Sequence, residues 1–286
     1  MPELPRISLV IPNLNCAKFI ERTIRSVLDQ NYPNLELILS DGGSTDGSLE
    51  IIEKYRPHFS HMISEPDSGQ ANALNKGFAF ATGEIMGWIN SDDILLPDSL
   101  SLVGSLFTLN QKTEWLTGRL TVIDENDQVQ CAVRPRPLTH ERFLAADYQW
   151  IQQESAFWRR SLWTRAGGYL DESLSLAVDG ELWLRFSRYA QLTSVHKQIG
   201  AFRVRSGQRS EAIDEYHAEM LKVIDHERRN ATETNDLTKA ILDAPLQLRQ
   251  RKEAEATFPG LTKHDPKPFK RSKLWKHALL RRMHHI

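Results

Sequence analysis

The first 110 or so residues of this chain alternate short apolar strands with helical segments, and this alternation constrains the fold more than any other feature. Strands are predicted at 7–11, 35–39, 61–64 and 85–89, and helices at 19–28, 49–55, 70–81 and from about residue 98. Pro12 is expected to end the first strand, and Asn15 is placed to cap the first helix. Strands that alternate with helices across short loops form a mostly parallel sheet with helices on both faces. The sequence therefore predicts an open α/β sheet of the nucleotide-binding type.

The second part of the chain follows a different pattern. Its predicted elements are a hairpin at 116–123 and 129–133, a mainly helical stretch at 139–190, a strand-like stretch at 192–204, and helices at 211–230 and 236–256. Pro and Gly residues in 257–270 indicate a linker into a basic tail. We expect residues 1–125 and 126–210 to be the two halves of one domain, and 211–286 to be a helical extension.

Composition excludes several protein classes. A chain of 286 residues with 40% hydrophobic and 26% charged residues is typical of soluble globular proteins. No run approaches the roughly 20 apolar residues of a membrane span, and the N-terminal residues lack the pattern of a secretory signal. The two cysteines, Cys16 and Cys131, form no CxxC pattern, so a disulfide framework and a zinc knuckle are disfavoured. A cytoplasmic location is therefore expected.

Charge is distributed unevenly along the chain. Residues 261–286 hold eight Lys or Arg against one Asp, a net charge of +7, while the rest of the chain carries −8. Apolar residues recur at helical spacing from about residue 272, which predicts a basic amphipathic helix. Such helices bind anionic membrane surfaces. A terminal helix that offsets the acidic body explains the pattern equally well, whereas the acidic body disfavours nucleic acid as a partner.

Carboxylates stand at the ends of two predicted strands. Asp41 ends the second strand and is followed by Gly42-Gly43, and the pair Asp92-Asp93 follows the fourth. In open α/β sheets ligands bind at such strand ends, and hard divalent cations bind carboxylates together with substrate phosphates. The alternatives are a glycine-rich turn that caps the next helix and a solvated loop with a capping Asp.

Asp179 begins a third segment of interest, Asp179-Gly180-Glu181-Leu182-Trp183. Leu182 and Trp183 give it a helical core face, with both acids near the helix start. One of these acids could serve as a general base at the mouth of a site, with Glu181 as the rival to Asp179. The alternative is that both merely interact with the helix dipole. Trp183 itself is expected in the core, while Trp150 and Trp158 could be in the core or stack on a sugar.

Taken together, these segments resemble the family 2 glycosyltransferases, which have the GT-A fold and invert the anomeric configuration. The resemblance covers about residues 5–210. Its motifs are Ile7-Ser8-Leu9-Val10-Ile11-Pro12-Asn13-Leu14-Asn15, Asp41-Gly42-Gly43-Ser44-Thr45-Asp46-Gly47-Ser48, Asp92-Asp93, Gln153-Glu154-Ser155-Ala156-Phe157-Trp158-Arg159-Arg160, Gly167-Gly168-Tyr169-Leu170-Asp171-Glu172 and Asp179-Gly180-Glu181-Leu182-Trp183-Leu184-Arg185. It implies a mixed, mostly parallel sheet flanked by helices.

The resemblance also implies roles for individual residues. Asp179 would be the catalytic base, and Asp93 the protein ligand of Mn²⁺ or Mg²⁺. Asp92 would face the ribose or donor sugar, Asp41 would bond the base, and the other residues at the donor would be Pro12, Asn15, Gln70, Asn75 and Lys76.

Three positions depart from the pattern of this family. Leu74 stands where many members have Arg, and Val178 where relatives often have an acid. Arg205 stands where relatives often have His, and an Arg there can only clamp an anion.

The sequence thus predicts a metal-dependent, inverting hexosyltransferase that moves a sugar from a nucleoside-diphosphate sugar to an acceptor hydroxyl. The expected acceptor is a sugar or a lipid-linked molecule, in cell-surface polysaccharide or glycolipid synthesis, with peripheral binding to the inner face of the membrane. The alternatives are a nucleotidyltransferase of related architecture and a catalytically silent nucleotide-sugar-binding protein. A dinucleotide oxidoreductase is disfavoured, because no GxGxxG follows the first strand.

Overall fold

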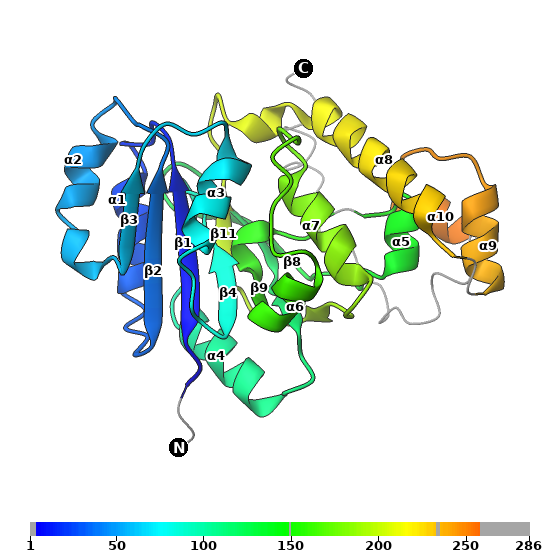
Figure 1. Cartoon of the computed structure of the whole chain (residues 1–286), viewed down its shortest axis with the longest axis horizontal. Coiled ribbons are helices and arrows are strands. Elements are labelled where there is room, and N and C mark those ends of the chain that lie inside the picture. The colour runs from blue at the N-terminus through cyan, green and yellow to red at the C-terminus, as the bar shows by residue number, and fades with distance from the viewer. Residues whose placement is uncertain (1–3, 149, 233–234, 258–286) are drawn as a thin grey trace.

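The computed structural model describes residues 4–148, 150–232 and 235–257 (Figure 1). The strands are β1 (Ile7–Asn13), β2 (Leu35–Asp41), β3 (His61–Ser64), β4 (Ile85–Trp88), β5 (Ile94–Leu95), β6 (Trp115–Thr117), β7 (Leu120–Ile123), β8 (Val129–Val133), β9 (Ala156–Arg159), β10 (Thr193–Ser194) and β11 (Gly200–Arg203). The α-helices are α1 (Ile20–Leu28), α2 (Ser48–Glu53), α3 (Gln70–Phe78), α4 (Ser99–Leu109), α5 (His140–Leu144), α6 (Arg160–Arg165), α7 (Val178–Ser187), α8 (Ile213–Asn230), α9 (Asp236–Asp243) and α10 (Arg251–Thr257). Three 3-10 turns are η1 (Arg56–His58), η2 (Gln153–Ser155) and η3 (Arg209–Glu211).

A seven-stranded sheet forms the centre of the molecule, in the order β10-β6-β9-β4-β1-β2-β3. Strands β1 to β4 are parallel to one another, as the sequence predicts. Strand β9 runs antiparallel between β4 and β6. The prediction of a mainly helical stretch at 139–190 missed this strand. The predicted fold class, a mixed and mostly parallel sheet flanked by helices, is confirmed.

A second sheet of four short strands, β5-β11-β7-β8, packs beside the first. The predicted hairpin exists as the antiparallel pair β7–β8. Its first arm was predicted too long, because 116–123 divides between β6 in the large sheet and β7 in the small one. The division lies near Gly118, where a Cβ would meet Ile199 Cγ1 and Lys197 O at 2.8 Å. The predicted boundary at 125/126 falls in the turn of this hairpin.

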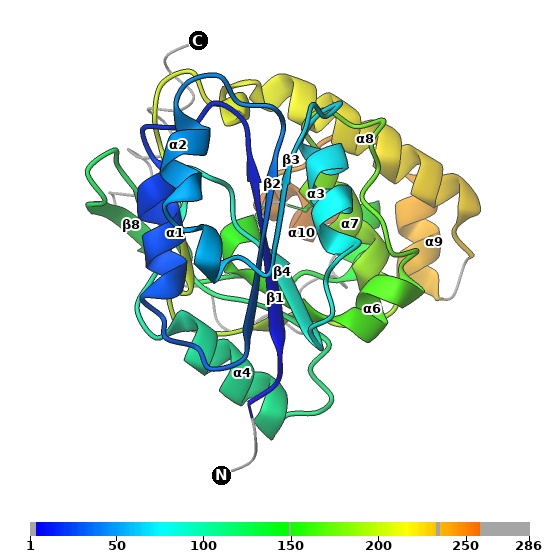
Figure 2. The same cartoon turned by 60° about the vertical axis from the view of Figure 1, so that its left-hand side comes forward.

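Helices cover both faces of the large sheet (Figures 1 and 2). On one face α1, α2 and α4 bury apolar side chains against β1 and β2, in a cluster that includes Ile24, Ile52 and Phe107. On the other face α3, α6, α7 and α8 build a cluster rich in tryptophan around Trp88 and Trp158. Trp158 and Trp183 are both buried, so Trp158 belongs to the core and the prediction for Trp183 is confirmed.

Strand β1 continues through Pro12 to Asn13, past the predicted end at Ile11. Val10 accepts a hydrogen bond from the N–H of Ile89, beyond the end of β4, while Asn13 accepts one from Gly42 after β2. Alternate residues of β1 therefore bond to opposite neighbours, and Pro12 faces the side on which β4 has already ended. Because no partner there requires an N–H, proline is tolerated.

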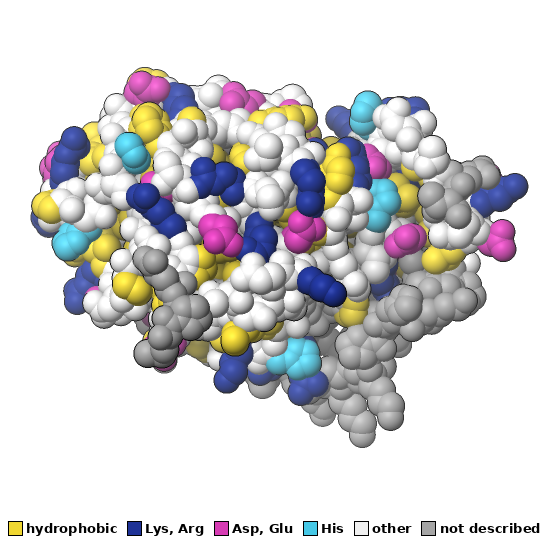
Figure 3. Space-filling view, turned by 60° about the horizontal axis from the view of Figure 1, so that its bottom comes forward, with side chains coloured by type: hydrophobic (Ala, Val, Ile, Leu, Met, Phe, Trp, Pro, Cys, Tyr) yellow, Lys and Arg dark blue, Asp and Glu magenta, His cyan; other side chains and the backbone are white. Residues whose placement is uncertain are grey.

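The C-terminal extension begins with α8, which crosses the α7 side of the molecule, and continues into α9 and α10 (Figure 1). The predicted helix at 236–256 is interrupted at 244–250, where Pro245 cannot continue a helix. Within the described ranges no helix is both long and apolar enough to cross a membrane. The predicted linker after residue 257 and the basic tail lie outside the described residues. On the face at the foot of Figure 1, acidic and basic side chains are interspersed (Figure 3).

Candidate active site

The carboxyl ends of β1, β2 and β4 meet at one edge of the sheet, because these strands are parallel. Asp41 ends β2, and Asp92 and Asp93 follow β4. In the chain, α7 follows β9 and precedes β10, and it runs antiparallel to β1, β2 and β4. Its N-terminal turn, which holds Asp179, therefore lies at the same edge. The edge thus gathers the carboxylates that the sequence singles out.

Asp41 is buried and bonded entirely by the protein. Its two oxygens accept hydrogen bonds from Asn13 Nδ2 at 2.7 Å, from the hydroxyls of Ser44 and Ser64, and from the N–H groups of Gly43 and Ser44. Although burial opposes ionisation, these donors hold the pKa of Asp41 below its usual value. A carboxylate has about four lone-pair sites, so a bond to a nucleobase would have to displace one of these donors.

Asn15 does not cap α1, contrary to prediction. It adopts a left-handed conformation with φ of 50°, and the helix begins after Phe19 without a side-chain cap. Its Oδ1 instead accepts a hydrogen bond from the N–H of Thr45 at 2.8 Å, and its own N–H donates to Ser44 Oγ at 2.8 Å. Asn15 therefore joins the loop after β1, which begins past Asn13, to the loop after β2.

Asp93 is 1% exposed, and its two oxygens have different partners. Oδ1 accepts the backbone N–H of Arg203 at 2.8 Å, and Oδ2 accepts Asn90 Nδ2 at 3.1 Å. Burial, together with the charge of Asp92, raises the pKa of Asp93 well above its usual value. A buried carboxyl beside a second one is a place where a cation lowers the electrostatic energy.

Asp92 is paired with Arg205, whose Nε lies 2.8 Å from Asp92 Oδ2. Arg203, which is buried, donates from Nε to the backbone oxygen of Asp92 at 2.6 Å and from NH1 to that of Asp124 at 2.8 Å. Its NH1 also lies 2.5 Å from Asp127 Oδ1. Arg203 therefore ties the end of β4 to the turn of the β7–β8 hairpin.

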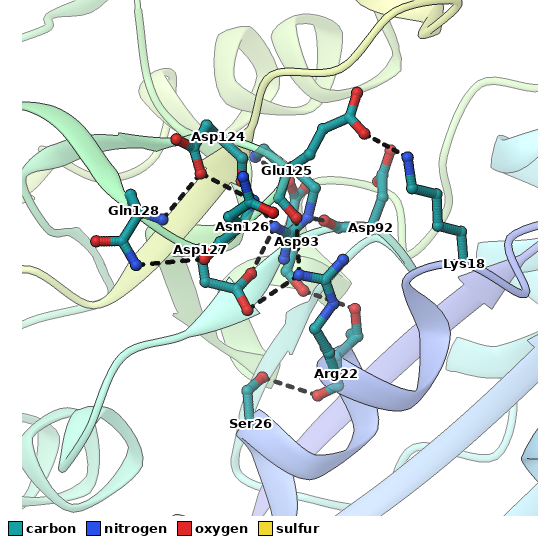
Figure 4. Close-up of polar contacts among 12 residues, drawn as sticks. Lys18, Arg22, Ser26, Asp92, Asp93, Asp124, Glu125, Asn126, Asp127 and Gln128 are labelled. Carbon is teal, nitrogen blue, oxygen red and sulfur yellow. Dashed lines mark hydrogen bonds and ion pairs between the residues drawn. The ribbon is translucent and has the colours of Figure 1, made fainter.

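Lys18, just before α1, and Arg22, within α1, contact the same turn (Figure 4). Lys18 pairs with Glu125, and Arg22 NH1 lies 3.1 Å from Asp127 Oδ2 and donates to the backbone oxygen of Glu125 at 2.8 Å. A small cleft of about 210 Å³ lies here, lined by Lys18, Glu125, Arg205 and the loop after β1. Lys18 and Arg205 give this cleft cations that a diphosphate could attract.

A hydrogen-bonded chain leads from Asp93 across the edge of the sheet. Asn90 Oδ1 accepts from Gln70 Nε2 at 2.6 Å, and Gln70 Oε1 accepts from Arg209 NH1 at 3.0 Å. The other terminal nitrogen of Arg209 donates to the backbone oxygen of Ser175, just before α7. Gln70 is thus linked to the Asp93 carboxylate through Asn90, a partner that the sequence motifs do not single out. Its expected place beside the donor stays a prediction.

Asn75 and Lys76 make their hydrogen bonds elsewhere. Asn75 Nδ2 donates to Leu170 O at 2.9 Å and to Glu172 Oε1 at 2.8 Å, while its Oδ1 accepts the N–H of Leu170. Lys76 Nζ lies 2.8 Å from Glu65 Oε1 and donates to a backbone oxygen of the same loop. Both residues hold loops that border the edge of the sheet.

Asp179 is half-buried near the start of α7. Its Oδ1 accepts the N–H of Gly180 at 2.7 Å and the hydroxyl of Tyr216 at 3.2 Å. Burial raises the pKa of Asp179 to about 6, against the opposing effect of these two bonds. An acid with this pKa is largely ionised near neutral pH and still basic enough to accept a proton.

Glu181, the other candidate base, is buried and bonded to an arginine of its own helix. Both of its oxygens contact Arg185, at 2.6 Å from Nε and 2.7 Å from NH2, and its exposed fraction is 8%. A carboxylate in a bidentate pair with arginine is a weak base. The geometry therefore favours Asp179 over Glu181.

Glu154 belongs to the same group of acids, although the sequence alone assigns it no role. It lies in η2 with 2% of its surface exposed, and its Oε1 has no hydrogen-bond partner among the described residues. Burial raises the pKa of Glu154 well above its usual value, and the charges of Asp93, Asp179 and Asp92 add to this shift. Its position in the Gln153–Arg160 motif was the one available signal.

A divalent metal would fit beside Asp93. The donors there are carboxylate oxygens, which hard cations prefer, and the buried Asp93 carboxyl lies beside the charge of Asp92, which adds to the rise in its pKa. Across the described part of the chain, no three His, Cys, Asp or Glu side chains converge as a metal-binding group. Magnesium commonly binds one or two carboxylates together with substrate phosphates, so such a convergence is not required.

Comparison with solved structures places this architecture among the GT-A glycosyltransferases. The structure of S. aureus TarS 1–349 in complex with UDP-GlcNAc matches with a TM-score of 0.65 and 19% identity, over 83% of this chain and 70% of that one. A mannosyltransferase from Pyrobaculum calidifontis, in complex with GDP-Man and Mn²⁺, matches with a TM-score of 0.62 and 18% identity, over 98% of this chain and 79% of that one.

Sequence comparison identifies the family. The model of Glycosyl transferase family 2 matches residues 8–128. An uncharacterised glycosyltransferase of Mycobacterium tuberculosis is 30% identical over 194 residues, which are 65% of this chain and 70% of the relative. The chain belongs to glycosyl transferase family 2. A chondroitin synthase of Pasteurella multocida is 29% identical over 68% of this chain, and the chain spans only 20% of that relative and 20–39% of several others.

Proposed function

We propose that this protein transfers a sugar from a nucleoside-diphosphate sugar to an acceptor hydroxyl with inversion of configuration. The observation that carries the proposal is that Asp93 and Asp179 lie at the same edge of the sheet. Asp93 is buried beyond the end of a strand, and Asp179 is half-buried at the start of a helix. A silent binding protein would need neither an acid with a pKa of about 6 nor a second one with a raised pKa.

In the proposed reaction Asp179 takes the proton of the acceptor hydroxyl. The acceptor oxygen bonds to the anomeric carbon as the bond from that carbon to the diphosphate oxygen breaks on the opposite face. One displacement of this kind inverts the anomeric configuration. Asp179 suits the role because it is partly exposed at the mouth of the site and its pKa lies close to neutral pH.

Asp93, with Asp92 beside it, would hold Mn²⁺ or Mg²⁺ at the end of β4. When bound there, the metal supplies positive charge that stabilises the departing diphosphate. The mannosyltransferase of similar fold is in complex with Mn²⁺ as well as GDP-Man, which supports this part of the proposal. Arg205 would clamp the diphosphate after exchanging its present partner, Asp92, for the ligand.

The nucleotide would lie against the loops after β1 and β2. Pro12 and Asn15 would line its pocket, and Asp41 would shape the pocket by holding the N–H groups of Gly43 and Ser44. Asp92 would face the ribose once released by Arg205, and Gln70 would border the donor sugar. We expect Asn75 and Lys76 to act through the loops that they hold.

A role in cell-surface polysaccharide or glycolipid synthesis is proposed from the relatives, among which is a chondroitin synthase. The acceptor would then be a sugar or lipid-linked molecule, reached from the cytoplasm at an anionic membrane surface. The basic residues of 261–286 support the membrane part.

A donor screen tests the proposal. UDP-, GDP- and dTDP-sugars are offered with and without Mn²⁺, and both nucleotide binding and slow hydrolysis are measured. We expect one nucleotide to bind more tightly with the metal and its sugar to be released with inverted configuration. A protein that binds none of these donors, or releases sugar with retention, would contradict the proposal. A nucleotidyltransferase would instead release pyrophosphate from a nucleoside triphosphate.

A further inference from the structure

We propose that α8, the first helix of the C-terminal extension, is part of the active site, and that its Tyr216 is a positioning residue for Asp179. The inference rests on the proposed function, because it takes Asp179 as the base. It goes further by assigning the orientation of that base to a helix that lies outside the stretch matched by the family model, residues 8–128.

The contact between the two helices is close and direct. The hydroxyl of Tyr216 donates to Asp179 Oδ1 at 3.2 Å. A Cβ at Gly180 would meet the same hydroxyl at 2.6 Å and Met220 Sδ at 2.4 Å. A side chain at position 180 would have to displace the hydroxyl that bonds to the base, so glycine suits the close contact of α8 with α7 here.

Helix α8 also fixes the backbone that leads into the base. The carboxylate of Glu219 accepts the N–H groups of Ser175, Leu176 and Ala177 at 2.8–3.0 Å. These bonds hold the pKa of Glu219 below its usual value despite the cost of burial. The N–H groups before and in the first turn of a helix lack partners within the helix, so Glu219 satisfies donors that would otherwise require water.

Two features of α8 therefore converge on one carboxylate. Glu219 sets where α7 begins, and Tyr216 sets how the Asp179 side chain is turned. With Oδ1 engaged by Tyr216 and the N–H of Gly180, Oδ2 is the oxygen left to receive the acceptor proton. A base needs this kind of fixed orientation, because small displacements of a catalytic group cost large factors in rate.

Several titratable groups face Asp179. Tyr216 faces it from α8, Arg209 from η3 and Glu154 from η2. The Tyr216 hydroxyl favours the ionised carboxylate, as does Arg209, while Glu154 is the group whose own ionisation Asp179 disfavours. Glu219 and Asp67 face Arg209 in turn. Of these, only Tyr216 is hydrogen-bonded to the Asp179 carboxylate through an uncharged donor.

The test compares Tyr216→Phe with Tyr148→Phe in the full-length protein. Both changes remove one hydroxyl from a tyrosine whose ring contacts His217. The Tyr148 hydroxyl, however, bonds to His217 Nδ1 at 2.7 Å and not to Asp179. In Tyr216→Phe we expect kcat to fall about threefold to tenfold with the donor KM unchanged. The acidic limb of the kcat profile should move up by about half to one pH unit, because the lost bond favoured the ionised base.

Tyr148→Phe should leave the profile of kcat against pH in place, and both variants should unfold at similar temperatures. The inference is overturned if Tyr216→Phe keeps the wild-type profile, or if Tyr148→Phe moves it by the same amount. Asp179→Asn separates the two levels of the argument. An active Asp179→Asn would refute the base itself, whereas an inactive one with an unchanged Tyr216→Phe would refute only the role of α8.

Discussion

The indole rings of Trp88 and Trp183 stack with their centroids 5.7 Å apart and 10° between their planes. Trp88 lies in β4, four residues before Asp92, and Trp183 lies in α7, four residues after Asp179. Trp158 packs against both rings, at 5.5 and 5.7 Å, and follows Glu154 by four residues. One group of buried rings therefore joins α7, which carries Asp179, to β4 and β9, which lie next to the segments that hold Asp92 and Glu154.

Replacement of Trp183 by Ala should destabilise the protein by about 3–5 kcal/mol, the usual range for removing a large buried aromatic side chain. The side chain is 2% exposed and contacts Trp88, Trp115, Trp158 and Phe186. Urea unfolding followed by circular dichroism measures the change. Leu109→Ala is the control, because Leu109 is 83% exposed and should cost under about 0.5 kcal/mol.

Asp93→Asn should abolish transfer and metal-dependent nucleotide binding while the fold is kept. The structure already bonds Asp93 at both oxygens and raises its pKa, so a neutral amide replaces it without leaving a buried charge. Calorimetry with nucleotide and Mn²⁺ is the measurement. Asp98→Asn, at an exposed position of the same segment, should bind normally. Unchanged metal-dependent affinity in Asp93→Asn would remove the assignment.

Asp179→Asn should bind donor normally and transfer at least about a hundredfold more slowly, the usual scale of a lost general base. In the wild type, kcat should halve near pH 6 and fall about tenfold per unit below it, because only ionised Asp179 accepts a proton. The pH profile and donor affinity are measured on both proteins. If Asp179→Asn moves sugar at the wild-type rate, another group is the base. An inactive Glu181→Gln with an intact fold would identify Glu181 as that base.

Glu154→Gln should leave the protein folded and make it less sensitive to rising pH. The folded protein raises the pKa of Glu154 above the unfolded value, so the folded state retains its proton longer than the unfolded chain does. The stability associated with the neutral acid is complete below the unfolded pKa and is lost as pH rises through the folded pKa. Gln cannot ionise, so the free energy of unfolding of the variant should gain on the wild type as the pH rises from about 4, the ordinary range for Glu, to the raised pKa of the folded protein. A constant difference across that range would show that Glu154 titrates normally.

The parallel strands were predictable, because a strand buried on both faces is a continuous apolar run. The acids after them were predictable too, because each follows the end of its run within a few residues of sequence. Strand β9 was not, because Ala156–Arg159 becomes a strand only by antiparallel pairing with β4 and β6. The burial of Glu154 depends on Gly200, where a Cβ would meet Glu154 O at 2.2 Å. Tyr216 lies 37 residues from Asp179, so only the folded chain shows their contact.

The last prediction concerns residues 261–286, which lie outside the described structure. Their net charge of +7 and their apolar residues at helical spacing predict reversible binding to anionic membranes, at about 1 kcal/mol for each basic residue near the lipid. Co-sedimentation with vesicles of anionic lipid at low salt measures it, with vesicles of neutral lipid as the control. Binding should weaken as salt rises, since exposed charges are screened. A full-length protein that ignores anionic vesicles, or that binds equally well without residues 261–286, would show that the tail serves instead to offset the acidic body of the chain.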